Sequence, residues 1–207
     1  MFHSKVPQCS RMMSATGCGR CTELGLLEGT LVRTRLGYRP IETLTMQDEL
    51  AVFPHSFKRL DSMRHHLAYV ESAACPHTAL PVLIPAGALG IHGELVLQHD
   101  MRVLLTDPDL RPILGTSNIT IRAADLVGFR GISLIRPQTM RLVVLAFESE
   151  EVITIDDAFR VVVPPEKTRI GQKPGTGWGG VAVYPLNANQ AEDYLANLDT
   201  EMAKLRL

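Results

Sequence analysis

The chain has 207 residues, of which 45% are hydrophobic and 21% charged, and its formal net charge is −1. This content is enough for the core of one sizeable domain or two small ones, and it excludes a disordered protein. The balanced charge excludes the broad basic face typical of nucleic-acid binders. The N-terminus lacks the apolar core of a secretory signal, and no apolar run approaches the roughly 18 residues of a membrane span. We therefore expect a cytoplasmic protein with neither a nucleic acid nor a membrane as partner.

Residues 1–23 show no hydrophobic periodicity, so we expect a flexible tail there. A hairpin follows, with strands at 31–34 and 38–41 on either side of Gly37, and Pro40 must lie in an edge strand or a bulge because it lacks an N–H. The remaining β-type runs are short and separated by turn residues, which predicts an all-β domain over residues 24–165 rather than a doubly wound fold. The further predicted strands are 49–53, 67–73, 81–84, 94–97, 102–105, 119–122, 132–135, 141–147, 151–155 and 159–163, and 123–126 can form one helical turn.

The C-terminal part divides into a Gly/Pro-rich linker at 166–186, in which Trp178 is expected to dock, and a helix at 187–207. Asn187 followed by Gln190 is a capping-box pattern that predicts the start of the helix. One face then carries apolar residues at helical spacing, namely Ala191, Leu195, Leu198, Met202 and Leu205. This face is expected to pack on the β-domain. The alternative is that it binds an unknown protein partner or forms a dimer.

Several segments of the β-domain form a recognisable series. The first is Gly25-Leu26-Leu27-Glu28-Gly29-Thr30, followed by the hairpin and Pro40-Ile41-Glu42. Four more follow in order, which are Gln47-Asp48-Glu49-Leu50, the run 80–90 around Gly87, the run 97–105 around Asp100, and the run 145–153. Together they make the chain similar to bacterial Hint domains, the hedgehog and intein type of protein-autoprocessing domain. The resemblance implies an all-β Hint fold, here followed by a C-terminal amphipathic helix, with motif residues Gly29, Thr30, Asp48, Gly87 and Asp100.

The same resemblance implies that the catalytic positions are empty. Autoprocessing begins when a Cys or Ser attacks the preceding carbonyl, and a His assists the proton transfers. The nucleophile position falls on Gly25, and the two family histidines fall on Met101 and Glu150. No His occurs after His99, so the His-Asn ending of inteins is absent as well. We therefore predict a degenerate member that acts as a structural or interaction module and needs no cofactor.

Two other functions stay open at this point. Cys21 lies four residues before Gly25, and His99 lies two residues before Met101, so an atypical autoprocessing domain can be drawn from them. A small metal-binding protein is the other possibility, because Cys18, Cys21, Cys75 and His77 offer the thiolate and imidazole ligands that zinc prefers. The second pair does not have the spacing of a standard zinc half-site.

Overall fold

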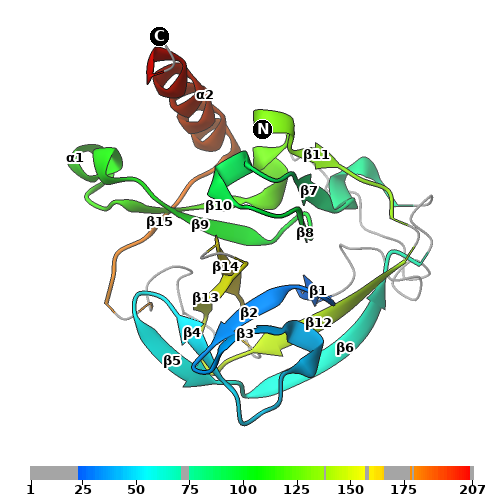
Figure 1. Ribbon diagram of the computed structural model, residues 1–207. Helices are drawn as coiled ribbons and strands as arrows, with labels where there is room; N and C mark the ends of the chain where they lie inside the picture. The colour runs from blue at the N-terminus through cyan, green and yellow to red at the C-terminus, as the bar shows by residue number, and fades with distance from the viewer. Residues whose placement is uncertain are drawn as a thin grey trace, which may run out of the picture.

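The structure, a computed structural model, describes residues 23–70, 75–137, 139–156, 159–165, 178 and 180–205, with the backbone alone for 199–205. It consists mainly of antiparallel strands in three sheets (Figure 1). The first sheet has the order β1 (Leu26–Leu27), β12 (Met140–Ala146), β6 (Ser62–Ala68). The third has the order β11 (Ser133–Leu134), β7 (Val82–Ile84), β8 (Leu95–Leu97). The predicted all-β architecture is thus confirmed.

The second sheet is the largest and runs through the middle of the domain. Its order is β15 (Tyr184–Pro185), β10 (Asn118–Arg122), β9 (Arg102–Thr106), β14 (Phe159–Val163), β13 (Glu151–Ile155), β2 (Leu31–Thr34), β4 (Glu49–Val52) and β5 (Ser56–Arg59), with β3 (Gly37–Pro40) paired to β2. The described α-helices are the single turn α1 (Arg111–Leu114) and the long α2 (Ala188–Leu205). Short 3-10 helices lie at Ile41–Thr43, His77–Ala79, Ala88–Gly90, Pro108–Leu110, Ala123–Leu126 and Phe129–Gly131. Among the described residues, no helix combines the length and the apolar character needed to cross a membrane.

The predicted hairpin forms as β2 and β3. Val32 is fully buried while Leu31 is exposed, as the alternation of a half-buried strand requires. Gly37 has φ of 111°, a value that favours glycine, and its carbonyl accepts a hydrogen bond from the Thr34 hydroxyl at 2.8 Å. In the described part of the chain β3 pairs with β2 alone, so Pro40 lies in an edge strand, as its missing N–H predicts.

Most predicted strands lie within a residue or two of the observed ones, and those at 151–155 and 159–163 have the predicted bounds. The strand expected at 67–73 is the exception, because β6 covers Ser62–Ala68. It contains Arg64, His65 and His66, whose polarity hides the strand from a hydrophobic pattern. What fixes β6 is its full-length pairing with β12, from Ser62 opposite Ala146 to Ala68 opposite Met140. Residues 71–74 lie outside the described part.

One hydrophobic core joins the sheets to the C-terminal helix. Ala191 and Leu195 of α2 are buried in this core, and Leu198 packs partly against it. The capping box forms as predicted, since the Asn187 side chain accepts from the Gln190 N–H at 3.0 Å and the Gln190 side chain accepts from the Asn187 N–H at 3.1 Å. Figure 1 shows α2 at one end of the domain, and the first sheet lies at the other. The side chains of Met202 and Leu205 lie outside the described part.

Trp178 is also buried. It packs with Leu104, Val152 and Val162 in a smaller cluster, so the region predicted as a linker docks on the domain at this point.

The motif residue Asp48 holds the turn that leads into β4. Its carboxylate accepts from the Thr45 N–H at 2.7 Å and from Arg39 at 2.8 Å. Partial burial acts to raise the pKa of Asp48, but the hydrogen bonds from Thr45 and the charge of Arg39 outweigh it and keep this pKa below its ordinary value.

Asp48→Asn should therefore destabilise the fold by about 1–3 kcal/mol at pH 7, the usual effect of losing hydrogen bonds to a charged group. A lowered folded-state pKa stabilises the protein above the unfolded pKa, about 3.9, and this stabilisation disappears as the pH falls through the folded value. Urea unfolding at pH 7 and below pH 4 measures the difference between the two proteins. A gap that stays constant across this range would contradict the assignment.

Candidate functional site

The position aligned with the family nucleophile is closed by backbone. Gly25 immediately precedes β1, and the register of β1 pairs Leu26 with Val143 of β12. A Cβ added at Gly25 would lie 2.9 Å from the Val143 carbonyl oxygen and 3.0 Å from a methyl group of Val144. The first contact is to backbone and cannot be relieved by a rotamer change. Glycine at position 25 is therefore set by close packing, and any side chain there requires the strands to move.

The amide that an acyl shift would break is held by a glutamine. The Gly25 N–H donates to Oε1 of Gln98 at 2.6 Å, and Gln98 is fully buried. The Met101 N–H donates to the Gln98 carbonyl at 3.0 Å, so residues 98–101 form a turn against Gly25. Gln98 thus contacts Gly25 through its side chain and Met101 through its backbone, and a direct contact between Gly25 and Met101 stays a prediction. The Met101 side chain itself is buried in the core.

Glu150 lies in the connection between β12 and β13 and is half-buried. Its negative charge acts to raise the pKa of Arg102, the residue after Met101. A direct approach of Glu150 to Gly25 stays a prediction.

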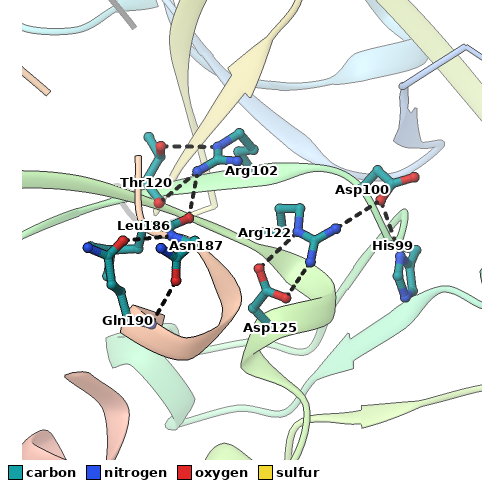
Figure 2. A network of polar contacts seen from close by, with 9 residues as sticks. All are labelled: His99, Asp100, Arg102, Thr120, Arg122, Asp125, Leu186, Asn187 and Gln190. Atoms are coloured by element: carbon teal, nitrogen blue, oxygen red, sulfur yellow. Dashed lines mark hydrogen bonds and ion pairs between the residues drawn. The ribbon is translucent and has the colours of Figure 1, made fainter. Parts of the chain in front are cut away.

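His99 lies at one end of a chain of polar contacts that runs through Asp100 and Arg122 (Figure 2). Its Nδ1 lies 3.3 Å from a carboxylate oxygen of Asp100, which in turn lies 3.9 Å from Arg122. Arg122 donates to both carboxylate oxygens of Asp125, at 2.9 and 2.7 Å, and the bond to Asp125 raises the pKa of Arg122.

Two backbone hydrogen bonds join the turn at 98–101 to the helical turn at 123–126. They run from the Ala123 N–H to the Met101 carbonyl at 2.7 Å and from the Ala124 N–H to the His99 carbonyl at 3.0 Å, and the Asp100 motif position lies beside them.

Arg102 connects the same region to the C-terminal helix. It donates to the side chain and the carbonyl of Thr120, at 3.1 and 3.0 Å, and to the Leu186 carbonyl at 3.3 Å, directly before the Asn187 cap (Figure 2). Burial and then the positive charge of Arg122 hold the pKa of Arg102 below its ordinary value, although Asp125 and Glu150 act to raise it. The guanidinium remains charged at neutral pH and fixes the approach to α2.

Gly29 and Thr30 form the turn between β1 and β2. The Gly29 N–H donates to the carboxylate of Glu42 at 2.8 Å, and the Ile41 N–H donates to the Thr30 carbonyl at 2.9 Å. This motif therefore joins β1, which directly follows Gly25, to the end of the first hairpin. Its role is to hold the backbone.

The cysteine candidates do not assemble within the described part. Cys75 is a buried free thiol and His77 is exposed, so this pair points to different environments. Cys18 and Cys21 lie outside the described residues. In the ranges that the structure describes, no three His, Cys, Asp or Glu side chains are grouped closely enough to hold a metal ion.

Sequence reasoning missed Gln98 and Arg102. Gln98 opens the segment that resembles the family's second catalytic block, and a buried position for an uncharged polar residue after Leu97 is the signal that was available. Arg102 has the appearance of an ordinary strand residue in the sequence, because its partners Thr120 and Leu186 are distant along the chain and no pattern reveals them.

Within the described residues, the amide of Gly25 is held by a hydrogen bond to Gln98. Protein acyl shifts need a nucleophile beside the carbonyl and an acid that protonates the departing amine. Gly25 supplies no nucleophile, and the Gln98 carboxamide accepts the amide N–H but does not act as an acid. What the site does physically is tie β1 to the turn at 98–101.

A strand-rich domain that begins with this turn and this hairpin is typical of the Hint class of folds. A model of the family described as Hint domain matches residues 24–160, and the chain belongs to this family. A solved structure of a GSH-linked, splice-inactive variant of the AceL NrdHF class 3 split intein is similar at 15% identity. The match covers 69% of this chain and 99% of that chain, with a TM-score of 0.41. No curated protein matches the chain.

Proposed function

We propose that this Hint domain carries out no self-processing and acts as a structural or interaction module. The observation that supports the proposal most directly is the closed position at Gly25, where the Val143 carbonyl occupies the space that a nucleophilic side chain needs. The hydrogen bond from the Gly25 N–H to Gln98 supports it further, since it places an acceptor where a proton donor is required.

The interaction role is assigned to α2. Its apolar face packs on the domain, and its other face exposes Glu192, Asp193 and Asn197. An acidic helix face of this kind favours a protein partner with a basic surface. The partner-binding role of α2 is part of the proposal.

An N-terminal fusion to the full chain is expected to stay uncleaved over days, with or without added thiol. Thiols release the upstream part wherever a thioester has formed, so they report the acyl shift directly. Intact mass spectrometry at successive times measures the outcome.

A Cys21→Ala variant of the same fusion is the matched control, because Cys21 is the remaining candidate nucleophile near Gly25 and alanine cannot attack a carbonyl. A thiol-dependent fragment that starts near Gly25 or at Cys21 and disappears in Cys21→Ala would establish the alternative, an autoprocessing domain with atypical residues.

A further inference from the structure

Trp178 and residues 180–186 form a strap that lies against the large sheet and leads into α2 (Figure 1). The strap begins at the buried Trp178, and its last part, β15, pairs in parallel with β10. The chain reaches the strap from Pro165 through residues 166–177, a stretch rich in glycine and lysine. The strap is therefore joined to the strands on its N-terminal side through this connection, and its place on the sheet depends on its own contacts.

The strap binds the edge of β10 through its backbone. The Leu186 N–H donates to the Thr120 carbonyl at 2.9 Å, and the Ala182 carbonyl accepts from the Thr116 hydroxyl at 2.6 Å. The Leu186 carbonyl accepts from Arg102 at 3.3 Å. An extended peptide that adds a strand to a sheet edge is held by main-chain bonds in the same way. Without the strap, β10 would be an edge of the nine-stranded sheet and so a template for another segment.

Trp178 is the side chain that holds the start of the strap. It packs against Leu104, Val152 and Val162, with the half-buried Phe53 beside them. We call these four residues the socket. Its three buried residues come from β9, β13 and β14, so the socket is formed by one face of the sheet and not by the strap itself. It accepts one aromatic side chain among apolar neighbours.

The fit of Trp178 to the socket is incomplete. In the described part of the chain, its indole Nε1 is buried without a hydrogen-bond acceptor. A donor of this kind gives up its bonds to water without replacing them, which weakens the docking of the strap. The neighbours in the sequence are Gly177, Gly179 and Gly180, which add no side chains to the contact. One aromatic side chain thus anchors this end of the strap, and a segment with the same feature can take its place.

We propose that the socket and the edge of β10 form a docking site for an extended segment of another protein with one aromatic anchor, and that the strap occupies this site until the partner displaces it. The strap defines the chemistry of the partner, namely an aromatic side chain for the socket and a backbone that pairs in parallel with β10. A segment tethered by a short linker has an effective concentration on the order of millimolar, so weak competitors are kept out. This surface differs from the acidic face of α2, and the proposal does not depend on whether the domain cleaves itself.

A peptide with the sequence of residues 175–187 tests the proposal on the full-length protein with Trp178→Ala. Trp178 is the only tryptophan of the chain, so in this variant the tryptophan emission of the peptide reports the burial of its own anchor. We expect saturable binding of one peptide per chain, with a shift of the emission to shorter wavelength. The peptide with alanine in place of its tryptophan should not bind. Fluorescence anisotropy of a fluorescein-labelled copy should show binding to the wild type that is weaker by about tenfold or more, because the wild-type strap competes.

Two matched variants in the Trp178→Ala background locate the binding site. Phe53→Ala removes a ring from the socket and should weaken peptide binding by about tenfold or more, as the loss of an aromatic contact at a central anchor does. Phe57→Ala removes a ring of β5 outside the socket and should leave the affinity unchanged. The two rings are closely matched, because both are half-buried and each stacks with an arginine, Phe53 with Arg160 and Phe57 with Arg35.

Circular dichroism confirms that the variants are folded. If Trp178→Ala is not, the wild type carries the test, since its single tryptophan reports the strap. The peptide with phenylalanine as its anchor, added on the order of millimolar, should then displace the strap and shift the Trp178 emission to longer wavelength. In that case an unchanged emission would overturn the proposal. With a folded Trp178→Ala protein, absence of saturable binding, equal binding of the alanine peptide, or an equal loss in Phe57→Ala would each overturn it.

Discussion

Replacing Gly25 with cysteine is expected to destabilise the domain by about 1–3 kcal/mol and to leave the chain uncleaved. The destabilisation follows from the geometry, since the new Cβ would lie 2.9 Å from the Val143 carbonyl oxygen, and overpacking of this size typically has that effect. The absence of cleavage follows from the neighbours of the new thiol. Gln98 and Met101 lie at the turn against position 25, and neither can protonate a leaving amine.

Gly25→Ala is the matched control, because it adds the same Cβ without a thiol. Urea unfolding should give similar losses of stability for the two variants, and mass spectrometry of fusions should show both intact. Adding Met101→His to Gly25→Cys is the fair test of restored chemistry, since general acid–base assistance is typically worth about 10²–10⁴-fold. Rapid cleavage by Gly25→Cys alone would mean that another residue, with His99 as the first candidate, supplies the proton.

Whether an element can be predicted from the sequence depends on whether its stabilising contacts are local or between distant parts of the chain. The hairpin β2–β3 and the start of α2 were predicted correctly because their signals are local, a glycine turn in one and the Asn187–Gln190 box in the other. Strand β6 was misplaced because its position is fixed by pairing with β12, more than seventy residues later in the chain. Short-range patterns carry no information on such a partner.

At the candidate site, too, local features were predictable from the sequence and long-range contacts were not. The empty nucleophile position was found from the order of motif segments, since Gly25 stands five residues before Thr30. The reason that it must be glycine lies in the approach of Val143, and the group that accepts from the Gly25 N–H is Gln98, 73 residues away in sequence. Both facts depend on the packing of β1 between distant segments of the chain. Local sequence patterns do not reveal this packing.

Gln98→Leu is expected to be the second strongly destabilising change. Leucine fills a similar volume but offers no acceptor, so the Gly25 N–H is left buried without its partner, at a typical cost of about 1–3 kcal/mol. The variant should unfold at lower urea concentration than the wild type. Hydrogen exchange at the Gly25 amide, measured by NMR, should rise more than exchange at residues of β14, which would show that the loss begins at β1.

Gln98→Glu separates the loss of the acceptor from the loss of shape, because a carboxyl group of nearly the same size still accepts from Gly25. Because position 98 is fully buried, the pKa of the introduced carboxyl group should be higher in the folded state than its unfolded value of about 4.3. A raised pKa means that the folded protein keeps a proton that the unfolded chain releases. The stability of Gln98→Glu should therefore be near that of the wild type at pH 4 and fall as the pH rises toward 7. A pH-independent difference would show that Gln98 is not buried against Gly25, and the account of the closed site would fail with it.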